Sequence, residues 1–177
     1  FKLGYSTGNS KVQDYNFISN ERNLDFVLEI NPLYNFTILH NLYLALNANV
    51  AAGGNLRNNN LILLLTYNLP LNMPMPYWFP SISIFLGGGY GVRQTRVAVD
   101  SEFAIAKINK NSNITAFNLG LEVTPAQLKD YNIGFYLEAK SMISNYSVIE
   151  YGEKKARRYI NNFVTIGMVY KINYLIK

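Results

Sequence analysis

Apolar and polar residues alternate with a period of two through almost the whole chain, and this feature restricts the possible folds most strongly. A period of two places every second side chain on the same face of an extended strand, whereas a helix repeats every three or four residues. In the segment 22–30, Leu24 and Phe26 fall on one face, and Asp25 and Glu29 fall on the other. The sequence therefore predicts an all-β protein.

About eight strands follow from this alternation. The predicted strands are the opening residues 1–5 and the segments 22–30, 36–50, 61–69, 78–92, 113–123, 131–143 and 162–176. The 177 residues contain no Ser/Gly-rich or Pro-rich linker, so we expect one domain over residues 1–177. The chain opens inside the first of these strands, which indicates a mature or trimmed sequence without its signal peptide.

The predicted connections alternate in length. Short ones marked by proline lie at 31–33, 72–76 and 124–130, and longer polar ones lie at about 7–21, 51–60, 94–112 and 145–158. In an up-and-down antiparallel sheet, such an alternation gathers the long connections at one edge and the short ones at the other. An even number of strands then places both termini at the edge with the short connections.

The composition indicates that the apolar face of the sheet meets lipid. The chain is 49% hydrophobic but only 15% charged, against roughly 25% charged residues in soluble domains. No stretch approaches the roughly 20 apolar residues of a membrane-spanning helix, whereas several predicted strands reach the roughly 9–11 residues of a spanning strand. The faces opposite the apolar ones carry mainly Gly, Ser and Asn, which fit the bore of a narrow barrel. We therefore predict a closed transmembrane β-barrel in contact with outer-membrane lipid.

Aromatic residues near the strand ends agree with this prediction. Tyrosine and tryptophan favour the membrane–water interface because one end of the ring is apolar and the other polar. The residues predicted at the interface are Tyr34, Tyr67, Tyr77, Trp78, Tyr131 and Tyr174. The alternative is that aromatic residues are here only because they favour strands.

In its strand number and loop alternation, the chain resembles the small bacterial outer-membrane barrels typified by the OmpA transmembrane domain and OmpX. The resemblance implies a location in the outer membrane, both termini in the periplasm and long loops at the cell surface. The chain departs from that family at its end, because it finishes in Lys177 where such proteins commonly finish in an aromatic residue. The abundance of Asn, Ile, Lys and Tyr is typical of an AT-rich bacterial genome, such as a spirochaete's.

Several charged residues fall on the predicted interior faces. They are Glu29, Arg93, Glu122, Glu138, Lys140 and Lys171. Isolated buried charges are costly, so we expect these side chains to pair with one another. The resulting network is either a static structural plug or, as the resemblance to the OmpA-like barrels implies, the gate of a narrow pore.

The sequence gives little support for catalysis or for a bound metal. Cysteine is absent and His40 is the only histidine, which excludes thiolate sites, histidine clusters and most hydrolase triads. The run Gly87 to Gly91 has no Lys-Ser/Thr after it, so it indicates a bend in a strand instead of a phosphate loop. We predict no catalytic residue, no metal, no cofactor and no enzymatic activity.

Basic residues in the predicted loops are candidates for binding an acidic partner. They are Arg96, Lys107, Lys154, Lys155, Arg157 and Arg158. Lipopolysaccharide phosphates, glycosaminoglycans or an acidic host protein fit this chemistry, and the alternative is a solvated hairpin tip. The net charge of +5 is scattered along the chain, so we expect no nucleic-acid binding.

Three functions remain open. The first is a surface scaffold or adhesin that binds host extracellular-matrix, serum or envelope molecules through its long loops. The second is a narrow, porin-like pore gated by the interior salt bridges. The third is a soluble, lipocalin-like ligand carrier, which would need an apolar bore and a hydrated exterior.

Overall fold

Antiparallel strands make up nearly all of the structure, which is a computed structural model. It describes residues 1–12, 18–30, 41–53, 56–71, 81–97, 111–150 and 153–172. The strands are β1 (Lys2–Val12), β2 (Ile18–Ile30), β3 (Leu42–Gly53), β4 (Leu56–Pro70), β5 (Ser81–Val97), β6 (Asn111–Thr124), β7 (Ile133–Glu150) and β8 (Glu153–Tyr170). A single 3₁₀ turn, η1 (Ala126–Leu128), lies between β6 and β7.

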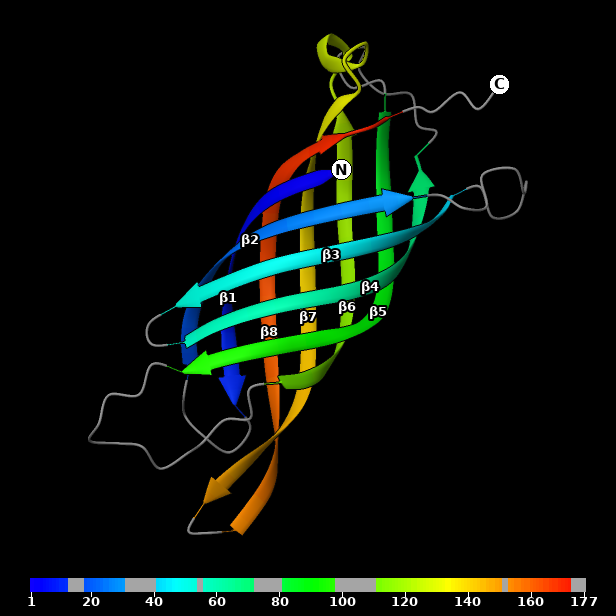
Figure 1. Cartoon of the computed structure of the whole chain (residues 1–177). Helices are drawn as coiled ribbons and strands as arrows, with labels where there is room; N and C mark the ends of the chain where they lie inside the picture. Colours follow the sequence, from blue (N-terminus) through cyan, green and yellow to red (C-terminus); the bar gives the residue numbers. More distant parts are fainter. Residues whose placement is uncertain are drawn as a thin grey trace.

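The sheet closes on itself because the first strand pairs with the last. The ladder between β1 and β8 runs from Lys2 opposite Val169 to Val12 opposite Tyr159. Around the barrel the strands follow one another in sequence order, and each pair is antiparallel (Figure 1). Closure removes the unpaired edges of an open sheet, so ladder hydrogen bonds continue around the whole ring of strands. The predicted closed up-and-down barrel of eight strands is confirmed.

The exterior of the barrel is apolar. On β4, Leu63 and Leu65 are 50% and 52% exposed, whereas Ile62 and Leu64 between them are 0% and 1% exposed. Other large apolar side chains on the outside are Leu3, Leu24, Phe26, Leu86, Phe117, Leu119, Leu137, Ile166 and Met168. A soluble carrier places its charges outside and its apolar residues inside, so this distribution contradicts the third alternative. It is the distribution of a barrel surrounded by lipid.

The interior is partly apolar, which differs from the prediction of a bore filled only by polar and small residues. A cluster of buried apolar residues comprises Val27, Ala45, Ile62, Leu64, Ile114, Ala116, Met142 and Phe163. The segment 61–69 has apolar residues on both faces of β4, and its inward residues Ile62 and Leu64 join this cluster. Leu64 and Ala116 lie in register with Gly89 on β5.

Glycines allow β5 to bend sharply in its middle (Figure 1). A Cβ atom at Gly89 would collide with the carbonyl oxygen of Leu63, and one at Gly91 with the carbonyl oxygen of Leu61. Only glycine permits β4 and β5 to approach so closely at these positions. The interpretation of this run as a bend, in place of a phosphate loop, agrees with the structure.

The two edges of the barrel are distinct. The N-terminus, the last residues of β8 and the η1 turn lie together at one edge, which we call the terminal edge (Figure 1). There the amino group of Phe1 donates a hydrogen bond of 2.8 Å to the carbonyl oxygen of Tyr170. The opposite edge, which we call the hairpin edge, contains the ends of β3 and β7. The sequence correctly placed both ends of the described chain at one edge.

Three of the predicted long loops, 7–21, 51–60 and 145–158, are wrong. Only residues 13–17 separate β1 from β2, only residues 54–55 separate β3 from β4, and only residues 151–152 separate β7 from β8, so most of each predicted loop is strand. Polar side chains such as Asn58 and Asn60 occupy regular ladder positions there. Their polarity comes from the barrel interior that they face and not from a loop. The predicted strand residues 36–40, with His40, lie outside the described residues.

The strands β7 and β8 continue beyond the rest of the barrel. The ladder with β6 ends at Ser144, and the ladder with β1 ends at Tyr159. From Asn145 opposite Arg158 to Glu150 opposite Glu153, six further pairs join β7 and β8 only to each other. We call these residues the β7–β8 extension, and Figure 1 shows it projecting from the hairpin edge.

Candidate functional site: an interior network and a basic edge

The predicted interior charges do lie inside the barrel. Arg93, Glu122, Glu138 and Lys140 are at most 3% exposed. The side chains of Glu29 and Lys171 are 18% and 44% exposed, because both residues lie near the terminal edge. The six residues do not form one cluster. They belong to two groups of ion pairs and to a chain of hydrogen bonds that continues toward the hairpin edge.

The terminal cluster joins Lys2, Glu29, Glu122 and Lys171. The Lys2 ammonium lies 2.8 Å from Glu29 Oε1 and 3.7 Å from Glu122 Oε2, and Lys171 pairs with the other oxygen of Glu122. The same ammonium lies 4.0 Å from the centre of the Phe85 ring, within the range of a cation–π interaction. Two cations therefore balance two carboxylates just inside the terminal edge.

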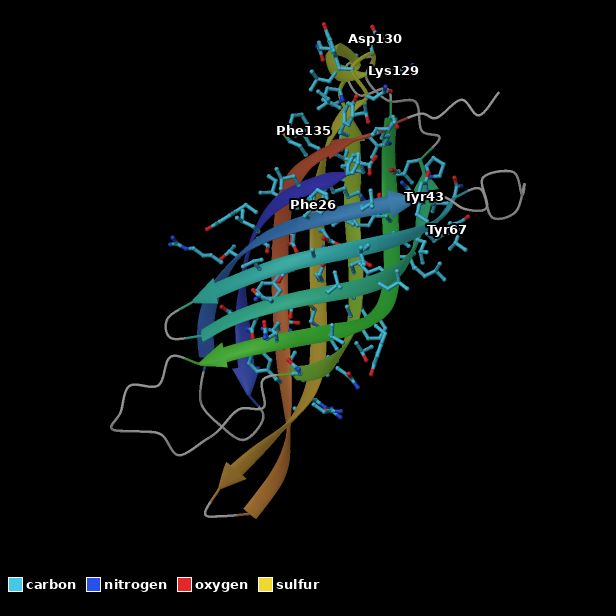
Figure 2. All side chains as sticks on the ribbon, in the orientation of Figure 1. Phe26, Tyr43, Tyr67, Lys129, Asp130 and Phe135 are labelled. Atoms are coloured by element: carbon cyan, nitrogen blue, oxygen red, sulfur yellow. The ribbon has the colours of Figure 1, made fainter. Side chains whose placement is uncertain are left out.

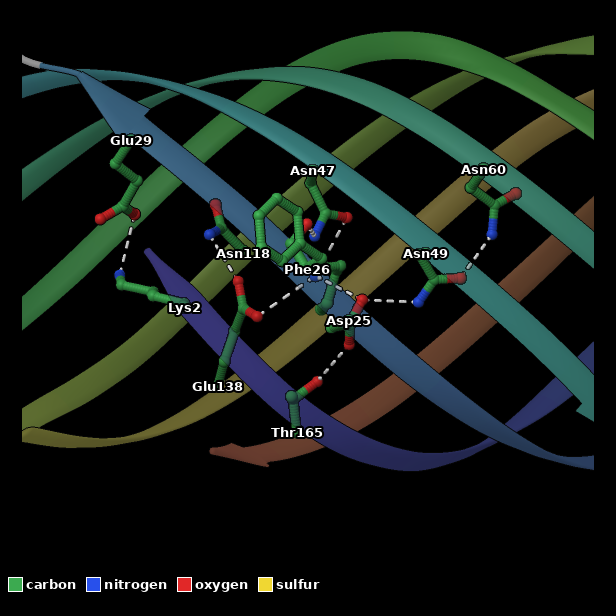
Figure 3. Close-up of polar contacts among 11 residues, drawn as sticks. Lys2, Asp25, Phe26, Glu29, Asn47, Asn49, Asn60, Asn118, Glu138 and Thr165 are labelled. Carbon is green, nitrogen blue, oxygen red and sulfur yellow. Dashed lines mark hydrogen bonds and ion pairs between the residues drawn. The ribbon is translucent and has the colours of Figure 1, made fainter. Parts of the chain in front are cut away.

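The central cluster consists of Lys140 between the carboxylates of Asp25 and Glu138. Figure 3 labels these two acids and their amide and hydroxyl partners. The Lys140 ammonium lies 3.4 Å from Asp25 Oδ1 and 3.2 Å from Glu138 Oε2, and all three side chains are buried. One cation faces two anions, so neutral donors supply the remaining stabilisation of the carboxylates. Asn49 and Thr165 donate to Asp25 at 2.6 and 3.0 Å, and Asn118 donates to Glu138 at 2.7 Å.

A chain of hydrogen bonds links the central cluster to Arg93. Asn60 donates to Asn49 at 2.8 Å, and Arg93 Nε donates to Asn60 at 2.8 Å. Arg93 Nη1 also donates to Ser144 Oγ at 3.0 Å, and its guanidinium lies 4.9 Å from the centre of the Tyr159 ring. These contacts extend the polar network from the middle of the barrel to the base of the β7–β8 extension.

Sequence reasoning missed two charged members of the network. Lys2 and Asp25 are 3% and 1% exposed and occupy the centres of the two clusters. The alternation had placed Asp25 on the polar face of its strand, and the same rule applied to residues 1–5 assigns Lys2 to the interior. The asparagines Asn47, Asn49 and Asn60 could have been found in the same way.

The network therefore lines the interior of the barrel with paired charges from the terminal edge to the middle of the strands. Among the described residues, no group of three or more His, Cys, Asp or Glu is placed to hold a metal ion. No helix in the described part of the chain is long and apolar enough to cross a membrane.

Two of the predicted interface aromatics are described. Tyr67 is half-buried near the end of β4, and Tyr131 is 67% exposed in the turn that follows η1. Figure 2 shows Tyr67 beside Tyr43, on the side of the barrel where β4 ends. Both Tyr67 and Tyr131 belong to the terminal edge. Tyr34, Tyr77, Trp78 and Tyr174 lie outside the described residues.

Most of the predicted loop residues lie on strands, which corrects their assignment to loops. Arg96 belongs to β5, and Lys154, Lys155, Arg157 and Arg158 belong to β8. Their polar, charged sequence is typical of a loop, but they belong to the part of the sheet that extends past the apolar exterior. Arg158 is exposed. Lys107 lies outside the described residues.

A closed antiparallel barrel of eight strands, apolar outside and ion-paired inside, is a small transmembrane β-barrel. Among solved structures, the chain is similar to Neisserial surface protein A (NspA), with 10% identity over 96% of this chain and 95% of that chain and a TM-score of 0.57. It is also similar to the outer membrane enzyme PagL, with 13% identity over 97% of this chain and 100% of that chain and a TM-score of 0.57. At these identities the likeness shows the fold. No protein-family model and no curated protein sequence matches the chain.

Proposed function

We propose that the protein is a bacterial outer-membrane barrel that acts as a surface scaffold and presents the β7–β8 extension to an acidic partner. The apolar exterior supports a membrane location, and both similar structures come from proteins whose names or descriptions refer to a surface or an outer membrane. The role is one of binding and not of catalysis. The partner belongs to the host extracellular-matrix or serum proteins, or to the envelope.

The extension is the observation that carries this proposal. Its six strand pairs continue past the end of the closed ring, and a paired strand loses less entropy on binding than a loop that must become ordered. Its sequence contains four basic residues, Lys154, Lys155, Arg157 and Arg158, against the two acids Glu150 and Glu153. The excess of positive charge attracts an acidic surface and accelerates association with it.

Binding to immobilised matrix and serum proteins tests the scaffold role. The protein in liposomes is compared with the variant Lys154→Gln/Lys155→Gln/Arg157→Gln, which keeps polar side chains and removes three charges. We expect the variant to lose at least tenfold in affinity, at about 1 kcal/mol or less for each rim charge. A second variant, Lys154→Arg/Lys155→Arg, keeps the charge and should bind normally. Equal binding by all three proteins, or binding by none, would refute the proposal.

The orientation in the membrane is part of the same proposal, with the hairpin edge at the cell surface and both termini in the periplasm. The chain contains no cysteine, so single cysteines provide clean probes. Asn145 and Lys129 are both exposed and lie at opposite edges. In intact cells we expect a membrane-impermeant maleimide to label Asn145→Cys and to leave Lys129→Cys unlabelled. Labelling of Lys129→Cys without labelling of Asn145→Cys would contradict this orientation.

A narrow gated pore is the second candidate, favoured by the position of Lys140 between two carboxylates. If the cation exchanges partners to open a path, Glu138→Gln should change single-channel conductance in planar bilayers by severalfold. Thr115→Ser, on the exposed face of β6, serves as the control and should leave the recordings unchanged. If neither the native protein nor either variant conducts ions at any voltage, the pore function is refuted.

A further inference from the structure

A groove lies on the exterior of the barrel, along β7 and between its two neighbours. Along each strand, exposed positions alternate with buried ones, and this defines an exposed and a buried register. In the exposed register of β7, Ala139 lies between Leu119 on β6 and Val164 on β8. The next residue of that register, Ser141, is also small and lies beside Phe117 on β6. The two short side chains therefore leave the surface hollowed between longer ones.

The groove has a volume of about 720 Å³. It crosses β6, β7, β8 and β1, four neighbouring strands that lie side by side in Figure 1. Small-molecule sites of ~300–1,000 Å³ are mostly apolar with a few polar groups. Phe117 and Leu119, which are 55% and 56% exposed, form one wall. Lys140 is the only charged residue in contact with the groove, and its side chain is buried in the barrel. We call this hollow the β7 groove.

Two asparagines lie at the end of the groove toward the hairpin edge. Asn9 on β1 lies opposite Asn162 on β8, and Asn162 lies opposite Ser141 on β7. Both asparagine side chains are exposed, and within the described part of the chain neither amide has a hydrogen-bond partner. An unpaired amide beside hydrocarbon is costly, because hydrocarbon offers neither a donor nor an acceptor. We call Asn9 and Asn162 the asparagine pair.

The asparagine pair lies where the apolar exterior ends. From Val164 to Ile172, the exposed register of β8 and of the residues after it is entirely apolar or aromatic. These nine residues have the length that a tilted strand needs to cross the hydrocarbon layer, roughly 9–11 residues. Asn162 is the next residue of the register in the direction of the hairpin edge. The β7 groove therefore begins at the boundary of the hydrocarbon layer and continues into it.

The stagger of the strands gives the same depth. A ladder row that starts at Ile30 on β2 passes through Leu65 on β4 and Asn162 on β8. It returns to β2 at Asn20, ten residues closer to the hairpin edge, or about 3 Å closer for each strand at a tilt of roughly 40°. Leu65 is in the middle of the exposed apolar residues of β4, which run from Leu61 to Leu69. Asn162, four strands further, lies about 12 Å from the middle of a hydrocarbon layer whose half-thickness is about 15 Å.

We propose that the β7 groove binds one acyl chain of a membrane lipid and that the asparagine pair donates a hydrogen bond to the carbonyl oxygen of that chain. The carbonyl of an ester-linked or amide-linked fatty acid lies between the headgroup and the hydrocarbon, which is the depth of the pair. The hydrocarbon tail then lies along β7 over Ser141 and Ala139 and packs against Phe117. One lipid thus supplies the acceptor that the amides need and fills the hollow. This site is separate from the β7–β8 extension.

Competition between two lipids tests the site. Purified protein in neutral detergent is mixed with equal amounts of a diacyl phosphatidylcholine and of its dialkyl ether analogue with chains of the same length. Bound lipid is identified by native mass spectrometry. The ether lipid has the same headgroup but lacks the carbonyl oxygens. We expect the native protein to prefer the diacyl lipid by at least roughly threefold, the effect of a single hydrogen bond.

Variants of the asparagine pair identify the donor. Asn9→Leu/Asn162→Leu keeps the approximate size of both side chains and removes both amides, so it should lose the preference for the diacyl lipid. Asn59→Leu/Asn113→Leu is the matched control, because it removes two exposed amides that do not line the groove. This control should keep the preference. Heat-modifiable mobility in gels shows that each variant is folded, and the single asparagine variants replace a double variant that does not fold.

A further variant tests the hollow itself. Ser141→Phe places a ring in the groove and should reduce the binding of both lipids by at least roughly threefold. Ala48→Phe is its control, because Ala48 is a small outward residue of β3, between Phe26 and Leu61 and away from the groove. This control should bind both lipids normally. Ser141→Leu replaces Ser141→Phe if the ring prevents folding.

Several outcomes would overturn the inference. The first is equal binding of the two lipids by the native protein, and the second is an unchanged preference in the folded variant of the asparagine pair. A native dimer that Ser141→Phe dissociates would assign the groove to a second copy of the chain. Absence of both lipids from the native protein would also contradict the membrane location, whereas binding of both without preference concerns the groove alone.

Discussion

Lys140 is the residue on which the central cluster depends. Its ammonium is the only cation in contact with both Asp25 and Glu138 among the described residues, and all three side chains are excluded from water. A buried ion pair contributes little net stability when compared with an apolar substitute, because both charges lose their hydration. Removal of one partner is different, since it leaves the other charge buried and unpaired.

We therefore expect Lys140→Met to destabilise the barrel strongly. The variant keeps the length of the side chain but leaves two carboxylates facing each other, at a cost of about 3–5 kcal/mol. Urea titration of the protein folded in phosphatidylcholine vesicles, followed by the fluorescence of the single tryptophan, measures the free energy of unfolding. Lys129→Met, in the exposed turn after η1, is the control and should change this value by less than about 0.5 kcal/mol.

The triple variant Lys140→Met/Asp25→Asn/Glu138→Gln separates charge from packing. It removes all three charges, so it should recover a large part of the stability that Lys140→Met loses. Unchanged stability in Lys140→Met, or no recovery in the triple variant, would contradict the role assigned to this cluster.

At the same scale, the sequence predicts which residues face inward but not which of them meet. Alternation alone assigns Asp25 and Lys140 to the interior, yet they are 115 positions apart and belong to β2 and β7. Their contact depends on how far the ladder is staggered when β1 closes on β8. That stagger is a property of the whole ring of strands, so local periodicity contains no information on it.

Strand β5 shows how single positions shape an element. Gly89 lies in the buried register against the backbone of β4, and a Cβ atom there would collide with the carbonyl oxygen of Leu63. At its neighbour Gly88, in the exposed register, a Cβ atom would lie 3.5 Å from the Phe117 ring and 3.7 Å from the carbonyl oxygen of Ala116, which are ordinary contacts. The two glycines are adjacent and chemically identical, but only one is required by the bend.

This difference predicts unequal effects of the same substitution. Gly89→Ala should destabilise the folded barrel by about 1–3 kcal/mol, because the backbones of β4 and β5 must separate. Gly88→Ala should be neutral or slightly stabilising, since alanine reduces the freedom of the unfolded chain at no steric cost. Urea titration of both variants in the same vesicles measures the difference. Equal effects would mean that the bend in β5 does not need Gly89.

The strand ends explain why the sequence prediction of the loops failed. Hydropathy locates only the part of a strand that lipid covers, whereas ladder hydrogen bonds continue into the headgroup region and beyond. Arg57 and Asn59 are polar although they are paired with β3 and β5. Their polarity was interpreted as a loop at 51–60. In a membrane barrel, a change from apolar to polar residues marks the edge of the bilayer and not the end of a strand.

For the whole molecule, exposed basic residues lie at both edges of the barrel. Arg22 and Arg158 are exposed at the hairpin edge, and Lys129 and Lys171 are exposed at the terminal edge. Between the two edges, the surface is apolar over about the thickness of a hydrocarbon layer. The stability of the molecule should therefore depend on the depth at which a charge is placed on its exterior.

The strand β4 offers two exposed positions that test this dependence. Leu65 lies in the middle of the apolar segment Leu61 to Leu69, and Asn59 lies just beyond its end, toward the hairpin edge. Leu65→Arg should cost about 2–4 kcal/mol in vesicles, whereas Asn59→Arg should cost about 0–1 kcal/mol. Both residues are exposed on the same face of the same strand, so the two variants place the same side chain at two heights along the barrel. Equal costs for the two variants would mean that lipid does not surround β4, because only a bilayer makes the energy of an exposed arginine depend on its height along the barrel.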